Sequence, residues 1–402
     1  MQIEDWSDTT LANVAEKKIV YGIVQAGDHD EGGMPYIKSS DVGKTIQPIT
    51  LTKTALSIHQ KYHRSKVQPG DIVFSLRGNT GATSIVPDGL PEANLTQGTA
   101  RIAVGPDYDN RFVRYVLASD IAMRQVLAVA KGSTFTEVSL DALRKITIPH
   151  PPLLEQRKIA DILSTWDAAI EKTEALLATA KAQKRALMQS LLTGRRRFPE
   201  FEGQPWQELR FEDVFSRVRR KNTVGNDNVL TISAQHGLVS QETYFNKRVA
   251  AKDLSGYTLL HQGDFAFNKS YSQGYPLGAI KMLEIDEPGV VSSLYLCFAL
   301  TDAGANSREF FRHFFEAGRF NHEIYKIAQE GARNHGLLNV SSTDFFRARL
   351  SVPSLTEQKL IARAIGSAEV KVDVHRRELA KLRTEKKALM QQLLTGKRRV
   401  VV

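Results

Sequence analysis

The residues in this 402-residue chain that could do chemistry give little support to catalysis. His59 and His63 have the four-residue spacing of a metalloprotease zinc motif, but Gln60 stands where the glutamate base would be. We therefore expect a surface histidine pair. The sequence contains no phosphate-binding P-loop motif and no Asn-Pro-Pro-Tyr segment of the adenine methyltransferase kind. These observations predict a non-catalytic chain that holds no metal or cofactor of its own.

Polar loops offer a different chemistry, which is hydrogen bonding to base edges. Arginine pairs with guanine, and asparagine or glutamine with adenine, while lysine neutralises phosphate. One set of loops follows two Gly-Asp steps, at 70–71 and 263–264, and a second set precedes Val138 and Val340. A third set is Lys38 with residues 235–236; the alternative is that all are plain solvent-facing turns. The predicted DNA-contacting residues are Lys38, Arg77, Asn79, Thr80, Lys131, Ser133, Thr134 and Thr136, and Gln235, His236, Lys269, Ser270, Tyr271, Gln273, Tyr275, Arg333, Asn334 and His335.

The overall charge also favours a polyanion as partner. The formal net charge is +10, and part of the excess lies in the runs 195–197 and 397–399. A merely basic protein is the alternative, and each run could instead stabilise the negative end of a helix dipole. Cys297 is the only cysteine, which excludes an intrachain disulfide and fits a reducing cytoplasm. No run of about 18 apolar residues and no signal peptide is visible, so we expect a cytoplasmic protein without a membrane span.

The chain repeats itself at an offset of 202 residues. Residues 184–197 share 11 of 14 positions with residues 386–399, and Glu155-Gln156 returns as Glu357-Gln358. A doubled unit implies approximate two-fold symmetry, and DNA is the commonest ligand with matching geometry.

Each repeat predicts a helix of about 38 residues, roughly 57 Å long. Prolines precede the two helices, and Gly194 and Gly396 stand where a left-handed residue would end them. Thr173/His375 and Lys184/Lys386 are polar positions in an otherwise apolar heptad seam, where they could fix register, face a partner or snorkel. The apolar seam residues, predicted to form a coiled-coil or partner interface, are Ile159, Leu163, Trp166, Ile170, Leu177, Leu187, Leu191, Ile361, Ile365, Val372, Leu379, Leu382, Leu389 and Leu393.

Four segments follow from these signals: a mixed α/β head at 1–150, a helix at 151–197, a second head at 198–352 and a second helix at 353–402. The linker 198–205 is too short to return the chain along a helix of this length, so it favours antiparallel helices with pseudo-two-fold symmetry. The helices match closely while the heads share only scattered anchors. That pattern predicts one shared spacer and two heads that read different half-sites.

These motifs resemble the specificity (S) subunits of type I DNA restriction-modification systems. The resemblance covers essentially the whole chain. It is carried by Met34-Pro35-Tyr36-Ile37-Lys38, by the step at 70–73, by the Pro-x-x-x-Glu-Gln segments that end at Gln156 and Gln358, and by the repeated Leu-Leu-Thr-Gly at 191–194 and 393–396.

The resemblance implies two target-recognition domains that each read one half of a bipartite site in double-stranded DNA. It further implies that two methyltransferase (M) subunits bind around the helices and that restriction (R) subunits join the larger assembly. S-adenosylmethionine, ATP and Mg²⁺ would then belong to those partners. The rival hypotheses are a coiled-coil scaffold whose basic charge is incidental and a stand-alone methyltransferase or nuclease.

Overall fold

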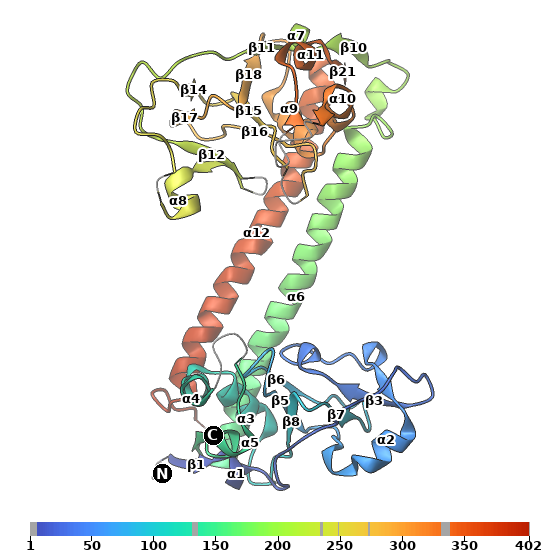
Figure 1. Cartoon of the computed structure of the whole chain (residues 1–402), viewed down its shortest axis with the longest axis vertical. Helices are drawn as coiled ribbons and strands as arrows, with labels where there is room; N and C mark the ends of the chain where they lie inside the picture. The colour runs from blue at the N-terminus through green and yellow to red at the C-terminus, as the bar shows by residue number, and fades with distance from the viewer. Residues whose placement is uncertain are drawn as a thin grey trace. The chain divides into compact units, whose positions relative to one another are not determined.

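The computed structural model describes residues 6–130, 136–233, 236–247, 249–271, 274–330 and 338–401. The chain folds as two compact units. Unit 1 comprises Met1–Glu174 with Arg377–Val402, and unit 2 comprises Ala175–Arg376. Each unit contains one globular head and half of each long helix (Figure 1). We call residues 6–150 head 1 and residues 198–352 head 2.

The regular elements of head 1 are short and alternate between strand and helix. The α-helices and strands are β1 (Ser7–Thr10), α1 (Leu11–Val14), β2 (Val20–Tyr21), β3 (Met34–Ile37), β4 (Lys53–Thr54), α2 (Leu56–Lys61), β5 (Ile72–Ser75), β6 (Thr83–Ile85), β7 (Asn94–Leu95), β8 (Thr99–Ile102), α3 (Asn110–Leu117), α4 (Asp120–Val129), α5 (Leu140–Arg144) and β9 (Thr147–His150). Three 3-10 turns, η1 (Ser39–Asp41), η2 (Pro48–Thr50) and η3 (His63–Ser65), link them.

Head 2 repeats this alternation with additional strands. Its elements are η4 (Pro199–Phe201), β10 (Gln207–Arg210), α7 (Phe211–Val214), β11 (Phe215–Arg217), β12 (Leu230–Ser233), β13 (Gly237–Ser240), α8 (Gln241–Phe245), β14 (Thr258–Leu260), β15 (Phe265–Asn268), β16 (Ala279–Met282), β17 (Gly289–Val291), β18 (Leu296–Leu300), α9 (Arg308–Glu316), α10 (Asn321–Ile327), β19 (Gln329–Glu330), β20 (Leu338–Asn339), α11 (Ser342–Arg347) and β21 (Arg349–Val352).

The two heads share one sheet topology. Head 1 has a four-stranded antiparallel sheet in the order β2-β8-β5-β6, and head 2 has the matching order β11-β18-β15-β16. In each head the first strand also pairs with the last, β1 with β9 and β10 with β21. The smaller sheets differ, because head 1 has a β4-β3-β7 sheet while head 2 has the pairs β12-β13, β14-β17 and β19-β20. The shared sheet is therefore the scaffold, and the smaller sheets give the heads different surfaces.

Two short sequence anchors explain why the scaffold recurs. Gly70 and Gly263 both adopt a φ of +88°, which favours glycine, and the following Asp71 and Asp264 accept hydrogen bonds from backbone N–H groups of the turn. In the Val-Ser pairs, Val138 and Val340 enter the core. Ser139 and Ser341 cap α5 and α11, since each hydroxyl accepts a hydrogen bond from a helix N–H.

Two 39-residue helices follow the heads, α6 (Leu153–Leu191) and α12 (Leu355–Leu393). Gly194 and Gly396 adopt φ values of +67° and +69°, so each helix ends at a left-handed glycine as predicted. Within unit 1, Asp167 of α6 pairs with Lys386 of α12, and Glu174 pairs with Arg383. Partner numbers rise along one helix as they fall along the other, so the helices run antiparallel (Figure 1).

Most predicted seam residues are removed from solvent. Ile159, Leu163, Leu177, Leu191, Ile361, Ile365, Val372, Leu379 and Leu393 are buried, and Trp166, Ile170, Leu187, Leu382 and Leu389 are half-buried. The ends of the helices also enter the cores of the heads. In unit 1, Ile159 and Leu394 pack with Leu11 and Phe112, and in unit 2 Leu192 packs in a phenylalanine-rich core. Each head core is thus completed by both helices.

In each unit an ion pair between a buried glutamate and a half-buried arginine joins the helix ends, and we call it the clasp. In unit 1, Arg399 donates two hydrogen bonds to Glu155, at 2.7 Å each, and Trp6 Nε1 donates a third at 3.1 Å. In unit 2, Arg197 donates two to Glu357, at 2.8 and 2.6 Å. The glutamate of each Glu-Gln segment and the last arginine of each basic run therefore form the same contact in both units.

Candidate nucleic-acid interface

In head 1, two of the predicted DNA-contacting loops meet. Arg77 lies exposed after β5 and forms a β-bridge with Glu137. Thr80 Oγ1 donates a hydrogen bond to the carbonyl of Thr136 at 2.7 Å, which ties the loop after β5 to the segment before α5. Asn79 Nδ2 donates to the carbonyl of Val42 at 3.2 Å, so its amide is partly used to hold the loop.

Lys38 joins the same surface. It lines, with Arg77, an open pocket of about 390 Å³, and its Nζ donates to Thr52 Oγ1 at 2.9 Å. Gln97 and Gly98 also line this pocket, and no local sequence pattern had singled them out. Head 1 therefore presents Arg77, Lys38 and Gln97 on one face.

In head 2, the loop after β15 occupies the equivalent place. The carbonyl of Lys269 accepts a hydrogen bond from Leu338 N at 3.0 Å, so this loop is also tied to the strand before α11. The side chain of Asn268 accepts from Ser270 N at 3.1 Å, and Tyr271 is 64% exposed. An exposed aromatic ring beside a lysine offers stacking and a cation at one point of the surface.

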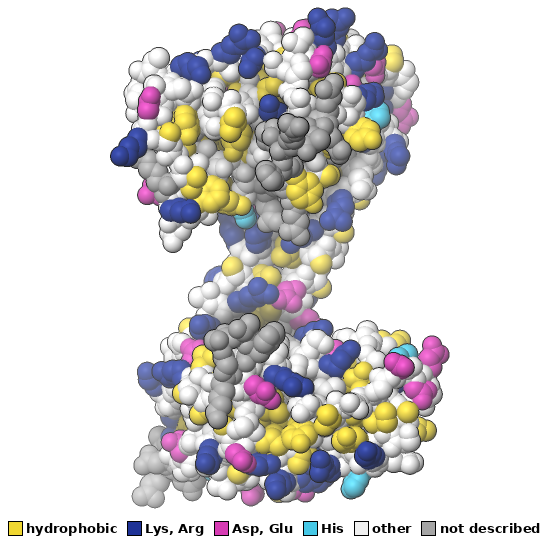
Figure 2. All heavy atoms as spheres, viewed as in Figure 1, with side chains coloured by type: hydrophobic (Ala, Val, Ile, Leu, Met, Phe, Trp, Pro, Cys, Tyr) yellow, Lys and Arg dark blue, Asp and Glu magenta, His cyan; other side chains and the backbone are white. Residues whose placement is uncertain are grey.

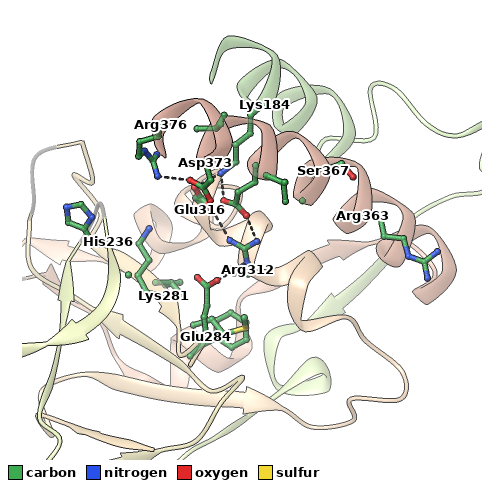
Figure 3. A pocket seen from close by; sticks show the side chains of 18 residues that line it. Lys184, His236, Lys281, Glu284, Arg312, Glu316, Arg363, Ser367, Asp373 and Arg376 are labelled. Atoms are coloured by element: carbon green, nitrogen blue, oxygen red, sulfur yellow. Dashed lines mark hydrogen bonds and ion pairs between the residues drawn. The ribbon is translucent and has the colours of Figure 1, made fainter. Parts of the chain in front are cut away.

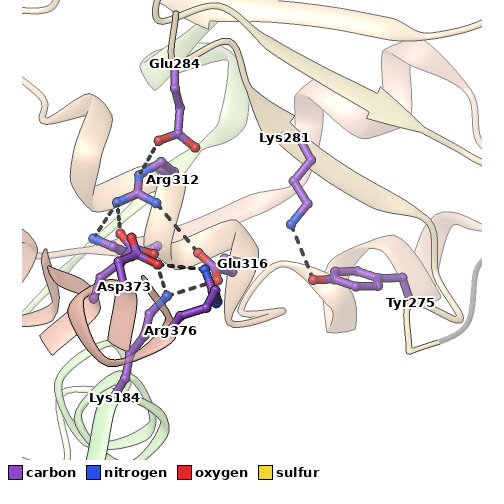
Figure 4. A network of polar contacts seen from close by, with 10 residues as sticks. Lys184, Tyr275, Lys281, Glu284, Arg312, Glu316, Asp373 and Arg376 are labelled. Carbon is purple, nitrogen blue, oxygen red and sulfur yellow. Dashed lines mark hydrogen bonds and ion pairs between the residues drawn. The ribbon is translucent and has the colours of Figure 1, made fainter. Parts of the chain in front are cut away.

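A groove of about 960 Å³ lies between head 2 and α12 (Figure 3). His236 and Lys281 line it from the head, and Arg363 and Arg376 line it from α12 (Figure 3). Lys281 Nζ lies 3.3 Å from the hydroxyl oxygen of Tyr275 and 5.0 Å from the centre of its ring (Figure 4). His236 and Tyr275, predicted from separate loops, thus both lie close to Lys281.

The floor of this groove is an ion cluster that explains one polar seam position. Lys184 contacts Glu369 at 2.6 Å and Glu316 at 3.3 Å, and Arg312 contacts Glu369 at 2.6 Å (Figure 4). Burial raises the pKa of Glu369, but the hydrogen bonds from Arg312 and Lys184 outweigh it and hold the pKa at about 2. These ion pairs of Lys184 therefore join α6 to α9 through Glu316 and to α12 through Glu369.

The equivalent cluster in unit 1 has the same plan with one change. Lys386 pairs with Asp167, and Arg114 reaches the same carboxylate at 3.3 Å. Tyr115 donates a hydrogen bond to Asp167 at 2.6 Å, where unit 2 has His313 next to Arg312. Lys386 thus pairs with a carboxylate that an arginine also contacts, as Lys184 does in unit 2.

Basic side chains do not by themselves mark the DNA-binding face. Figure 2 shows Lys and Arg spread over the visible surface of both heads, with Asp and Glu between them. The loops after β5 and β15 are therefore the more specific indication. Eight of the predicted DNA-contacting residues lie outside the described residues and have no structural description: Lys131, Ser133, Thr134, Gln235, Gln273, Arg333, Asn334 and His335.

The prediction of a surface pair at His59 and His63 is wrong for His59. His59 is 5% exposed, its Nδ1 is hydrogen-bonded to Asn94, and its Nε2 lies 2.8 Å from Glu92. It is a buried polar residue that joins α2 to the segment around β7, since a buried imidazole needs partners for both nitrogens. Within the described residues, no group of three or more His, Cys, Asp or Glu side chains is placed to hold a metal ion.

Comparison with known proteins shows which proteins this chain is similar to. The model of the type I restriction modification DNA specificity domain matches residues 3–181. A putative MjaX specificity subunit from Methanocaldococcus jannaschii is 23% identical over 99% of this chain and 94% of that relative. The chain is therefore similar to type I restriction-modification specificity subunits. The EcoBI specificity subunit from Escherichia coli is 28% identical over 47% of this chain, but the match spans only 40% of that relative.

The fold of this chain also has a solved counterpart. The type I S subunit from M. genitalium has a TM-score of 0.59 and 14% identity, and the match covers 97% of this chain and 96% of that one. The predicted architecture of two heads and two antiparallel helices is confirmed. Among the described helices, none is both long and apolar enough to cross a bilayer.

His313 should make the stability of unit 2 sensitive to acid. Its Nδ1 is buried without a partner among the described residues, and burial, with Arg312, lowers its pKa from 6.5 to about 4. Because the folded pKa lies below the unfolded one, the stabilisation is complete above pH 6.5 and is lost as the pH falls toward 4. We expect unit 2 to lose about 2–3 kcal/mol of unfolding free energy over this range.

The measurement is urea unfolding at pH 7 and pH 4, followed by hydrogen exchange in α9. A His313→Gln variant cannot titrate and should lack this component, and α3 of unit 1, which carries Tyr115 instead, serves as the internal reference. Equal pH dependence of the wild type and the variant would contradict the assignment.

Proposed function

We propose that this chain is the non-catalytic DNA-recognition subunit of a type I restriction-modification complex. Each head reads one half of a bipartite site in double-stranded DNA, and the helix pair sets the spacing between the halves. The observation that carries the proposal is the tied loop after the Gly-Asp strand of each head. The loops stand at equivalent places on one scaffold but carry different residues, Arg77 and Asn79 against Lys269 and Tyr271. A reader of two different half-sites needs this combination of common scaffold and divergent surface.

The partners follow from the same proposal. Two methyltransferase subunits dock on the helices, restriction subunits join the larger assembly, and these partners carry S-adenosylmethionine, ATP and Mg²⁺. The work of the complex on the cell's DNA places the chain in the cytoplasm.

Exposed residues of the helix repeat support docking of two equal partners. Packing explains why Met188, Leu191 and Leu192 match their copies, because they lie in the core of unit 2. It does not explain the identity of exposed side chains, since those positions are free to drift. Such pairs are Ala186 with Ala388, Gln189 with Gln391 and Arg196 with Arg398. A partner that binds the same surface twice accounts for them.

Replacing Ala186 or Ala388 by glutamate should prevent one methyltransferase subunit from binding. We expect Ala186→Glu or Ala388→Glu to leave one methyltransferase subunit per chain, and the double variant to leave none, because a charge buried without a partner costs several kcal/mol. Native mass spectrometry of the co-expressed complex gives the stoichiometry. Ala168→Glu is the matched control, since Ala168 is exposed and its counterpart is Val370. Loss of partners in the control alone would contradict the docking surface.

DNA competition tests the function itself. Mapping of methylated adenines in cells that carry the whole system supplies the target. The complex should then bind a duplex with that target at least about 1,000-fold more tightly than a scrambled duplex, and its affinity should fall steeply with salt. A coiled-coil scaffold with incidental charge would show the salt dependence but no preferred duplex. Transfer of methyl groups by the purified chain alone would contradict a non-catalytic role.

A further inference from the structure

The backbone next to Arg77 is fixed at Leu76, which is hydrogen-bonded to Gly98 and to Val138. The carbonyl of Gly98 accepts hydrogen bonds from Leu76 N at 2.8 Å and from Ser39 Oγ at 3.0 Å. On the other side, the carbonyl of Leu76 accepts from Val138 N at 2.9 Å. Arg77 therefore projects from an anchored point, which lowers the entropy lost when its side chain binds a ligand.

The guanidinium of Arg77 is held by a neutral group. Its Nη2 donates to Gln97 Oε1 at 3.3 Å, and no carboxylate pairs with it among the described residues. Arg111 and Arg114, in the same head, are instead neutralised by Asp161 and Asp167. Gln97 thus orients Arg77 and leaves its charge available, while the Gln97 amide nitrogen has no partner among the described residues.

Gly98 keeps this pair close to the opposite wall of the pocket. A Cβ on Gly98 would lie 2.8 Å from Ser39 Oγ and 3.3 Å from Arg77 Cγ, so a side chain there would displace Ser39 and crowd Arg77. Lys38 stands in the same pocket with its ammonium on Thr52 Oγ1 and no acidic partner among the described residues. The pocket is therefore lined by the cationic side chains of Arg77 and Lys38 and by the Gln97 amide, whose nitrogen has no partner among the described residues.

We propose that Gln97 is a specificity-determining residue of head 1, which positions Arg77 to read a guanine in the major groove. Arg77 donates to guanine O6 and N7, the Gln97 amide donates to an acceptor of the adjoining base, and Lys38 binds the flanking phosphate. Adenine is rejected because its N6 amino group donates where guanine O6 accepts. This inference rests on the proposed function and assigns the reading of one base to named side chains.

The test uses the full chain in complex with its methyltransferase subunits. The probes are duplexes of the mapped target and variants with each other base at each position of the half-site that head 1 reads. Arg77→Ala should lose discrimination at one guanine by about 10- to 100-fold. Gln97→Ala should lose about 10-fold at the same guanine with nearly unchanged binding to scrambled DNA. Lys38→Ala should weaken all duplexes alike and reduce the salt slope by about one.

The controls separate the possible outcomes. Gln60→Ala changes an exposed glutamine of α2 in the same head and should behave as wild type, and discrimination at the half-site read by head 2 should not change in any variant. Unchanged discrimination in Gln97→Ala, or an Arg77→Ala effect at a base other than guanine, overturns this inference alone. A wild-type complex without any preferred duplex overturns the proposed function as well.

Discussion

Replacing Glu357 by alanine is expected to lower the unfolding free energy of unit 2 by about 3–5 kcal/mol. Glu357 is 1% exposed, and it accepts both hydrogen bonds of the Arg197 guanidinium. The substitution leaves a half-buried arginine without its anion, which costs more than the net contribution of the pair. The same reasoning applies to Glu155 in unit 1, where the loss also deprives Trp6 Nε1 of its acceptor.

The measurement is urea unfolding of the full chain, followed by hydrogen exchange in each unit. Each substitution should act on its own unit, because Glu155 with Arg399 and Glu357 with Arg197 lie in different units. Asp373→Ala breaks the exposed pair with Arg376 and should cost less than about 1 kcal/mol. A loss of similar size in Glu357→Ala and Asp373→Ala would show that the clasp contributes no more than a surface ion pair.

Deleting one heptad from each helix is expected to change the DNA site that the complex recognises. Removal of residues 172–178 and 374–380 keeps the antiparallel register of the charged pairs on either side. Seven residues correspond to about 10 Å of helix, so the preferred spacer should shorten by about three base pairs. The original site should then bind at least about 100-fold more weakly, because only one head can engage its half-site at a time.

The matched control exchanges the same heptad without changing helix length. Residues 172–178 are replaced by the sequence of residues 374–380, which preserves the seam residue at 177, since Leu379 is its counterpart. The preferred spacer of this exchange variant should equal that of the wild type. A shortened chain that still prefers the original spacer would refute the idea that the helices measure distance.

Local signals in the sequence predicted the scaffold well. The two Gly-Asp steps lead into matching strands, β5 and β15, because the turn depends only on a left-handed glycine and the aspartate beside it. The heads predicted to be mixed α/β each contain helices beside their strands, α3 and α4 in head 1 and α9 and α10 in head 2. Heptad spacing and terminal glycines predicted the length of the long helices, about 38 residues against the observed 39, but the segments 151–197 and 353–402 extend past the last helical residues, Leu191 and Leu393.

Contacts between distant segments were not predictable in this way. The spacing of His59 and His63 contains no information about Asn94 and Glu92, which bury the first histidine. The contact of Gln97 with Arg77 forms only because η1, the loop after β5 and the segment before β8 lie together in the fold. Similarly, the heptad pattern treats each helix as a separate segment, whereas Leu394 belongs to the core of head 1.

The assignment of helix segments to units determines the order in which the chain can fold during synthesis. Unit 2 is continuous, Ala175–Arg376, whereas unit 1 joins Met1–Glu174 to Arg377–Val402. Head 1 leaves the ribosome first, but Leu394 and Arg399, which complete its core and its clasp, leave last. Head 1 must therefore wait, with apolar surface open to chaperones or to aggregation, until the second head has been made. A stop codon after residue 376 would therefore leave unit 2 whole but remove part of unit 1, so head 1 would be destabilised more than head 2.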